Sequence, residues 1–512
     1  MSGQQQTLFE SVPVERLQLQ SKEDLIEFIK LQQKVNETIL KDNKRLRLLN
    51  NELEQKTLYV EDHYITLKNK FFGKSSEKSP SKEDQRKARG PKKRRKKIQL
   101  PSLRYPNAPL IERDVELESL PSCKCCGKEM MDSGMTENNE YLTVIPAQHI
   151  VIRQKCHKYR CGKCHGSIVT APAPPRIKPG SGYSDKMVID IALSKYCDLI
   201  PIERYSSIAG RGGLEDLPPH SLIAQTHYLA EFVMGAYERV KAEILREKVL
   251  RADETPHRML EDNAGKAWYL WGFSTLESCY FDIRNTRSGV VASELLIDSN
   301  CQYLVSDVFS GYRKAVKQTN KERAKNNGPP IVNIYCNAHA RRKFKEAEAK
   351  FPLESKDFVD LYRKVYRLEK IAKARPPGRI LRARKYMTKQ FEKMKQLALN
   401  NIAGYSTKSS IGKAYGYFLK NYKGLTAFIT HPDLPIDNNL QESLLRSPVV
   451  GRKTWYGTHS QRGAKTAAII FTLVESCKLN QTNPRDYFKK LVQNIHQGKN
   501  SLTPKEFKNL TH

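Results

Sequence analysis

Two aspartates in the central part of the chain each follow a short apolar run. Asp253 follows Lys248-Val-Leu-Arg-Ala, and Asp307 follows Gln302-Tyr-Leu-Val-Ser. We expect each run to be a strand and the two strands to be neighbours, which places both carboxylates side by side at strand ends. Hard carboxylate oxygens grouped in this way suit two Mg²⁺ ions about 4 Å apart. Such an ion pair activates a water or a 3′-hydroxyl for in-line phosphoryl displacement.

A third carboxylate is expected on a later helix, because two aspartates rarely hold both ions. The best candidate is Glu442, in Pro435-Ile-Asp-Asn-Asn-Leu-Gln-Glu, where an Asp or Asn can cap a helix start. Glu475, on the following helix, is the next candidate for this position. Glu254 is left out because it points to the opposite face of its strand from Asp253. An aspartate at a strand end is usually a turn or capping residue, so the hypothesis depends on all three carboxylates in this order.

Cations and aromatic residues surround the third carboxylate. Arg446 lies four residues after Glu442, on the same helical face. Arg452, Lys453 and Trp455 follow in Gly-Arg-Lys-Thr-Trp-Tyr-Gly. Cations contact the DNA backbone and aromatic rings stack on unpaired bases, so we expect these four residues to bind nucleic acid.

A Cys-x-x-His pair, Cys336 and His339, follows a predicted strand at 331–335. The pair offers two ligands for a metal, but no second pair stands near it in the sequence. We therefore expect these residues to brace the core, with His339 near the phosphate or metal pocket.

Two Cys-x-x-Cys pairs form a second group with metal-binding spacing: Cys123 with Cys126, and Cys161 with Cys164. Each pair can turn two thiolates toward one ion, and two pairs complete a tetrahedral Zn²⁺ shell. Alternating residues at 141–146 and 150–153 predict a β-hairpin between the pairs, as in a zinc ribbon. Because four cysteines close the shell, we expect a structural metal. The spare ligands that leave the individual assignment open are Cys125, Cys156, His157 and His165.

The charge balance of the whole chain favours a polyanionic partner. Its 512 residues include 88 Lys and Arg against 55 Asp and Glu, a net charge of +33. No apolar window approaches the roughly 18 residues that cross a bilayer, and the first residues contain no apolar signal core. We therefore expect a cytoplasmic protein that binds double-stranded DNA and no membrane. The eleven cysteines then indicate reduced thiols or metal ligands.

The region that precedes the cysteines predicts one long helix at 21–71. Every seventh residue from Leu25 to Leu67 is apolar except Gln32. A sustained heptad row indicates a coiled coil, so we expect a homodimer or a higher homo-oligomer. The alternative is a long helix packed on its own body.

A basic segment follows this helix. Residues 74–97 hold twelve basic and three acidic residues among Ser, Pro and Gly, which is typical of a flexible linker. A nuclear-localisation signal is the alternative to sequence-independent phosphate contact for its densest run. That run is Lys92, Lys93, Arg94, Arg95, Lys96 and Lys97.

The helical region at 184–250 begins with a predicted helix at 185–196. A second helix opens at Pro201, a glycine turn spans 210–213, and a long helix starts at Ser221. This order is compatible with helix-turn-helix DNA binding, and a plain helical spacer fits it equally well.

After residue 248 the sequence predicts three strands, then a helix, then further strands. Strands are expected at 248–253, 268–273, 279–283, 302–306 and 331–335, with a helix at 290–296. This is the order of a ribonuclease-H-like mixed α/β sheet, within a multidomain α+β chain. A helical insertion, broken at Pro376-Pro-Gly, separates the second carboxylate from the third. The expected units are 1–72, 73–100, 101–175, 176–247, 248–475 (insertion about 345–430) and a helical tail at 476–512.

Taken together, these blocks resemble the DDE-type bacterial transposases of the insertion sequence 66 family. The shared blocks are 71–78, the two Cys pairs, 195–204, 252–256, 306–312, 336–344, 437–442, 451–453 and 462–463. The resemblance implies that Asp253, Asp307 and Glu442 form the catalytic triad of a Mg²⁺-dependent enzyme. Such an enzyme cuts and joins DNA at the ends of a mobile element, near the bacterial nucleoid. Whether accessory proteins of that element take part stays open. The chain departs from the family pattern at Asn337, where an aromatic residue is usual, and at Ser443, where Arg is usual.

Two other classes of function stay open. One is a non-catalytic DNA-binding accessory protein or decayed transposase, against which the three intact carboxylates argue. The other is a structure-specific repair or junction nuclease on the same fold. Inverted repeats in the flanking DNA would separate a transposase from such a nuclease.

Overall fold

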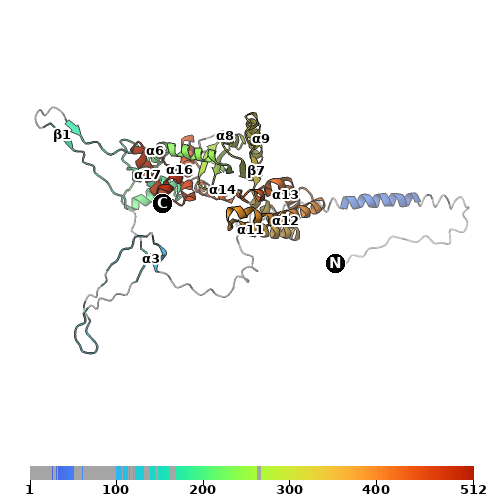
Figure 1. The fold of residues 1–512 in the computed structure, drawn as a ribbon, viewed down its shortest axis with the longest axis horizontal. Coiled ribbons are helices and arrows are strands. Elements are labelled where there is room, and N and C mark those ends of the chain that lie inside the picture. Colours follow the sequence, from blue (N-terminus) through green and yellow to red (C-terminus); the bar gives the residue numbers. More distant parts are fainter. Residues whose placement is uncertain are drawn as a thin grey trace. The chain divides into compact units, whose positions relative to one another are not determined.

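The computed structural model describes residues 33–50, 100–131, 139–143, 148–161, 168–261 and 267–511, apart from gaps at 107, 114, 116–118 and 120. It also describes the single residues Ile26, Lys30, Leu53 and Val60. The basic run at 92–97 and Cys164 lie outside the described residues, as do the ends of the heptad row. The chain divides into two compact units, 1–73 with 175–201 and 223–512, and 74–174 with 202–222. Figure 1 labels the helices and strands of the ribbon. No helix in the described part of the chain is long and apolar enough to cross a membrane.

The N-terminal helix is present across residues 33–50, within the predicted span. Its apolar heptad residues stay exposed: Ile39 is 51% and Leu46 is 56% exposed. Pairing of this row with a second helix stays a prediction.

The cysteine-rich unit contains little regular structure. Helix α3 (Pro101–Arg104) is tied to the chain near residue 140 because Ser102 donates from its backbone N and its hydroxyl to the Glu140 carboxylate, at 2.7 and 2.8 Å. Its two strands, β1 (Lys158–Arg160) and β2 (Ile168–Thr170), pair antiparallel. The same unit contains α5 (Ile202–Arg211).

The hairpin predicted between the two Cys pairs is wrong for the residues that the structure describes. Residues 141–143 and 150–153 lie in no strand, and the antiparallel pair brackets the second Cys pair instead. Alternation alone was misleading here because neither face of this segment is covered: Tyr141 is 75% and Val151 is 88% exposed.

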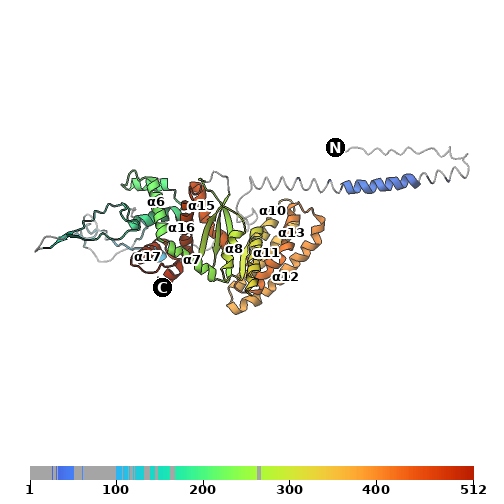
Figure 2. The same cartoon turned by 90° about the horizontal axis from the view of Figure 1, so that it is seen from above.

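A five-stranded sheet forms the centre of the other unit. Its strands are β3 (Val249–His257), β4 (Trp268–Ser274), β5 (Cys279–Arg284), β6 (Tyr303–Ser306) and β7 (Val332–Tyr335). They lie in the order β5-β4-β3-β6-β7, with β3, β4 and β5 antiparallel and with β6 and β7 parallel to β3. Figure 2 shows α7 (Met234–Arg246) and α16 (Gln461–Leu479) on one side of the sheet and the insertion helices on the other.

One strand boundary differs from the prediction. Strand β3 does not end at Asp253 but continues to His257, because residues from Asp253 onward still pair with β4, Asp253 opposite Gly272. The pairing of β3 with β6 ends at Arg251. Pro256 lies beyond that point, so its missing backbone N–H interrupts no hydrogen bonds between β3 and β6.

The edge strand β5 is closed by side chains of α16. The backbone N–H groups of Cys279 and Phe281 donate to the hydroxyls of Ser476 and Thr472, at 3.0 and 2.9 Å. The Tyr237 hydroxyl of α7 donates to the Phe281 carbonyl at 3.0 Å. These bonds satisfy outward-facing backbone groups of Cys279 and Phe281 and so protect this part of the edge.

Helices α4 (Asp185–Tyr196), α6 (Pro219–Phe232), α17 (Pro484–His496) and α18 (Pro504–Thr511) complete this body. The long helix predicted from Ser221 is in fact two helices. Between α6 and α7 the backbone at Val233 leaves helical geometry, with ψ at 11°. Helices α8 (Val290–Ile297) and α9 (Ser310–Lys325) flank β6 in sequence.

The helical insertion has its own hydrophobic core, which reaches the sheet through Val305 and Ile334. It consists of α10 (Asn337–Ala347), α11 (Pro352–Lys373), α12 (Pro377–Asn401) and α13 (Ser410–Thr426). Inside it, buried Arg384 binds both oxygens of Glu369, at 3.0 and 2.6 Å, and donates to the carbonyls of Phe428 and Leu434. This cation therefore ties the insertion to the segment that returns to the sheet.

Candidate active site

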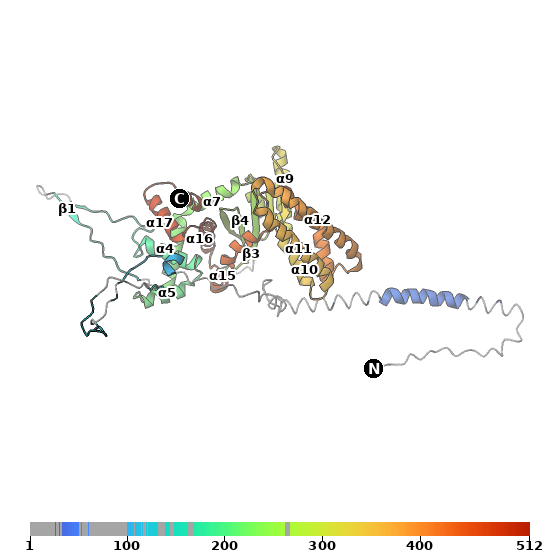
Figure 3. The ribbon, with the colours of Figure 1, turned by 60° about the horizontal axis from the view of Figure 1, so that its bottom comes forward.

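Asp253 and Asp307 come from the two parallel strands at the centre of the sheet. The last pair in their register is Arg251 with Val305, two residues before Asp253 and Asp307, and the Asp307 charge acts on Asp253. The backbone N–H of Phe309 donates to Asp307 Oδ1 at 2.9 Å, which orients this carboxylate at the start of α9. Figure 3 shows β3 and β4 between α16 and the insertion helices.

Three nearby negative charges act on Asp253. Burial, together with the charges of the Glu254, Asp307 and Glu442 carboxylates, raises its pKa to about 8. A buried carboxyl group among like charges favours its protonated form unless a cation offsets the repulsion. The donors are hard oxygens, and they fit Mg²⁺.

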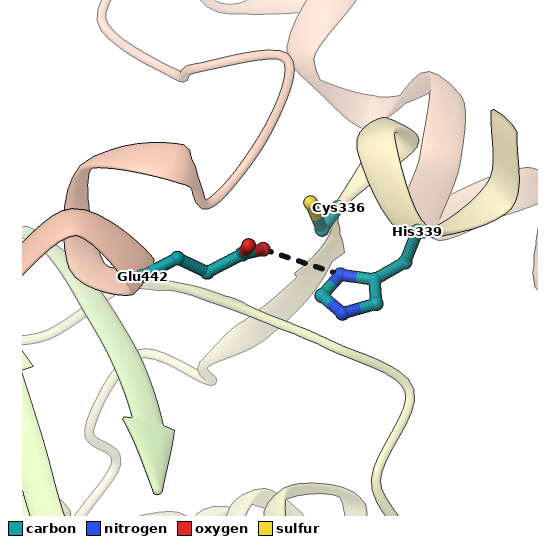
Figure 4. A group of neighbouring side chains, drawn as sticks. All are labelled: Cys336, His339 and Glu442. Atoms are coloured by element: carbon teal, nitrogen blue, oxygen red, sulfur yellow. Dashed lines mark ion pairs between the residues drawn. The ribbon is translucent and has the colours of Figure 1, made fainter. Parts of the chain in front are cut away.

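Glu442 lies on α14 (Asn439–Leu444), which begins where the insertion returns to the sheet. Its Oε1 is 3.5 Å from His339 Nδ1, and its Oε2 is 3.7 Å from Arg342 Nη2. The ligand atoms of Cys336, His339 and Glu442 all lie within 4.8 Å of one another (Figure 4). Among the described residues, Asp253, Asp307 and Glu442 do not form such a tight group. Two ions about 4 Å apart would bridge a wider separation.

Cys336 is buried, and its thiol is held by backbone groups. The N–H of Asn438 donates to its sulfur at 3.2 Å, and the N–H of His339 does so as well. Burial raises the pKa of this thiol to about 12, so it stays protonated at neutral pH. The Asn438 bond to the sulfur supports the bracing role of Cys336.

Asn438 joins the helix of the third carboxylate to the strand of the first. Its side-chain Nδ2 donates to the carbonyl of Ala252, next to Asp253, at 2.9 Å. The sequence predicts that an Asp or Asn caps this helix, and Asn438 does occupy the N-cap position. Its side chain makes no capping bond, however: Nδ2 is bound to β3, and the buried Oδ1, which would accept such a bond, has no partner. This positioning link was missed from the sequence.

A glycine makes the close approach of α14 possible. A Cβ on Gly272, the β4 partner of Asp253, would lie 2.3 Å from Gln441 Nε2. Gln441 is fully buried, so it has little room to move. A glycine inside the aromatic strand Trp-Tyr-Leu-Trp-Gly-Phe was the available signal, since such a glycine often marks a close contact.

Glu254 is held by other partners. Its side chain is 2% exposed and accepts from Arg287 Nε and Nη2, at 2.9 and 2.8 Å. The Tyr312 hydroxyl donates to its other oxygen at 2.6 Å. Arg287 in turn lies over the Phe309 ring, 4.2 Å from its centre. Glu254 thus fixes the loop that carries Asp307.

The predicted DNA-contact residues at α15 (Arg446–Trp455) lie in different settings. Arg446 and Lys453 are exposed. Arg452 donates to the Thr255 hydroxyl of β3 at 3.4 Å. The Trp455 ring packs edge-on against Tyr196, with Lys195 5.2 Å from its centre, so it also serves as a packing residue.

Asn337, which departs from the family pattern, is fully buried with partners. Its Nδ2 donates to the carbonyls of Leu425 and Ile436, at 2.9 and 3.0 Å, and its Oδ1 accepts from the Tyr362 hydroxyl at 3.3 Å. The residue therefore joins α10 to the end of the insertion. Glu475, the reserve candidate for the third carboxylate, is 3% exposed and paired with Lys478 at 2.7 Å.

The first Cys pair forms a tight turn in the other unit. Cys123 N donates to the Lys128 carbonyl at 2.7 Å, and Gly127, at φ +68°, donates to the Cys123 carbonyl at 2.9 Å. Backbone N–H groups of Cys125 and Cys126 lower the pKa of the Cys123 thiol. A stabilised thiolate in such a turn fits a zinc ligand. Cys161 is exposed at the end of β1, and Cys164 lies outside the described residues.

Comparison with known proteins gives two matches to families. The family described as "Transposase IS66 family" matches residues 180–466, and the "zinc-finger binding domain of transposase IS66" matches residues 121–165. The chain is also similar to uncharacterized proteins of Sinorhizobium fredii (strain NBRC 101917 / NGR234). It is 26% identical to y4jD over 398 residues, 75% of this chain and 76% of that protein. It is 29% identical to y4qI over 416 residues, 76% of this chain and 73% of that protein.

Proposed function

Because the chain belongs to the transposase IS66 family, we propose that it is a DNA transposase whose catalytic residues are Asp253, Asp307 and Glu442. In this proposal it binds the ends of a mobile element and cleaves and transfers DNA strands with two Mg²⁺ ions. The observation that carries the proposal is the convergence of the three carboxylates: the charges of Asp307 and Glu442 both act on the pKa of Asp253.

The arrangement of the strands supports a ribonuclease-H-like catalytic domain. Three antiparallel strands followed by two parallel ones, in the order β5-β4-β3-β6-β7, are the order expected of that fold. The second and third carboxylates are separated by the helical insertion, and Asn438 and Cys336 hold the returning helix against β3.

The chain's own residues hold and orient the reacting groups. Bound Mg²⁺ ions would activate water, then the freed 3′-hydroxyl, and stabilise the leaving oxygen. His339 and Arg342 face Glu442 and are placed to orient it and to contact a phosphate. No covalent enzyme–DNA intermediate is expected, because the nearby Cys336 thiol is buried and protonated and the Tyr312 hydroxyl is bound to Glu254.

The zinc-finger region and the basic linker would supply affinity for double-stranded DNA. We infer that Cys123, Cys126, Cys161 and Cys164 hold one structural Zn²⁺. The N-terminal heptad row would pair two or more copies, so that two element ends can be held together. In this proposal the protein acts at the bacterial nucleoid.

Cleavage by the full-length protein of a plasmid that carries the element's terminal repeats tests the proposal. Strand cleavage should require Mg²⁺, and Asp253→Asn should lower its rate at least about a thousandfold, on the order of 4 kcal/mol of barrier. Asp298→Asn, an exposed aspartate after α8, is the control and should cleave normally. Normal cleavage by Asp253→Asn, or a covalent protein–DNA adduct, would refute the proposed chemistry.

A further inference from the structure

A pocket of about 520 Å³ opens beside Asp307. Its walls come from the loop and helix after β6, from α10 and from α13, so it lies where the helical insertion meets the sheet. His339 and Arg342, which face Glu442, also line it. The pocket is therefore continuous with the proposed catalytic site.

The pocket combines cations with aromatic rings. Its lining includes four cationic residues against two acidic ones. The cations are Arg313, Arg342, Lys343 and Lys420, and the aromatic residues are Phe309 and Tyr417. Lys343 Nζ lies 4.8 Å from the centre of the Tyr417 ring. Cations bind phosphate oxygens, and aromatic rings stack on the face of any base.

The shape of the pocket limits what can enter. Its volume falls in the range of roughly 300–1,000 Å³ that holds one small organic ligand, and a nucleotide belongs to that size class. A duplex is too wide for it, since its major groove alone is about 12 Å across. At Gly416, on the α13 wall, a Cβ would meet nothing within 4 Å, so this wall borders open space.

We propose that this pocket holds one unpaired nucleotide of the DNA strand next to the scissile phosphate. The inference rests on the proposed function, because it names the substrate conformation at the same site. Arg313 and Lys420 contact the phosphates on either side of this nucleotide, and Tyr417 or Phe309 stacks on its base. The helical insertion thus takes part in substrate recognition. The protein recognises that the nucleotide is unpaired and does not read which base it carries.

Binding by the full-length protein tests this inference, with Ca²⁺ in place of Mg²⁺ so that no strand is cut. Two fluorescent duplexes of the same sequence are compared, one blunt and one with a three-nucleotide single-stranded extension. We expect the extended duplex to bind about tenfold more tightly, the effect of one stacked base. Arg313→Glu and Lys420→Glu should each abolish that preference. Lys413→Glu, at an exposed position on α13 outside the pocket, should keep it.

Equal affinity of the wild-type protein for both duplexes would overturn the inference, and so would equal losses in Lys413→Glu and Lys420→Glu. A free nucleotide shares the same chemistry, so ATP is added as a competitor. Displacement by ATP without any preference for the extension would assign the pocket to a free nucleotide and overturn the inference as well. Asp253→Asn should lose cleavage and keep the preference. If Asp253→Asn loses cleavage but the wild-type protein shows no preference for the extended duplex, this inference alone is refuted. If the wild-type protein shows the preference but Asp253→Asn cleaves normally, the proposed function alone is refuted.

Discussion

The sheet-centred body and the cysteine-rich unit are stabilised in opposite ways. In the body, Trp271, Phe273 and Phe281 are at most 1% exposed, and the edge strand is closed by hydroxyl groups. In the cysteine-rich unit, every residue of β1 and β2 is exposed, including Ile168 at 66% and Val169 at 64%. None of the described residues of 100–170 is buried, and a segment of this kind needs a metal or a partner to fold. We therefore propose that the body folds by burial and uses metal for chemistry, whereas the cysteine-rich unit uses metal for folding.

Removing zinc should unfold the cysteine-rich unit and leave the sheet-centred body folded, and this is the largest effect expected. Structural Zn²⁺ contributes roughly 10–16 kcal/mol in small finger peptides. Cys161→Ser should therefore lose the bound zinc and the hydrogen-exchange protection of residues 121–170. Protection of β4 and β5 should not change. Elemental analysis and exchange mass spectrometry measure both, and full zinc content in Cys161→Ser would contradict the assignment.

The converse test is to break the body without touching the metal. The side chains of Arg384 and Glu369 are 1% and 4% exposed. Arg384→Met therefore leaves a buried Glu369 carboxylate without its guanidinium partner. Removal of one member of a buried ion pair costs about 3–5 kcal/mol. Urea unfolding followed by circular dichroism should show this loss at unchanged zinc content. Arg382→Met, at an exposed position on the same helix, should unfold like the wild type.

A smaller and more local effect is expected at Asn438. Asn438→Ala removes the bond to the Ala252 carbonyl and should destabilise the body by about 1–3 kcal/mol. Because the same bond holds Glu442 relative to Asp253, cleavage should fall by about 10–100-fold and need more Mg²⁺. Asn439→Ala, whose side chain is exposed and bonded to Asp437, is the control. A variant that lost stability but kept the wild-type rate and Mg²⁺ requirement would show Asn438 to be only structural.

Local patterns predicted most elements of the body. The bounds of strands β4, β5, β6 and β7 were each predicted to within one residue, because alternating or apolar runs ended at clear turn residues. The end of β3 was misplaced because Asp-Glu-Thr-Pro resembles a strand end, and only the pairing with β4 carries it on. The prediction of a hairpin within 141–153 was wrong because the alternating apolar residues of this segment pack against no core.

The contacts within the candidate site were harder to predict than its carboxylates. Residue type and order identified the three carboxylates as candidates. The bond between Cys336 and Asn438 spans 102 residues, and that between Asn438 and Ala252 spans 186. No local pattern encodes such a link. The pocket beside Asp307 also arises only when α10 and α13 pack against the sheet.

The central claim is that Glu442, and not Glu475, completes the catalytic triad. Single-turnover cleavage of a terminal-repeat substrate by Glu442→Gln and Glu475→Gln tests it most directly. Glu475 is a matched control because it is buried in the same body and paired with Lys478. We predict that Glu442→Gln loses at least about a thousandfold in rate while Glu475→Gln stays within about tenfold of the wild type. A near-normal rate for Glu442→Gln, with the large loss in Glu475→Gln, would contradict the account.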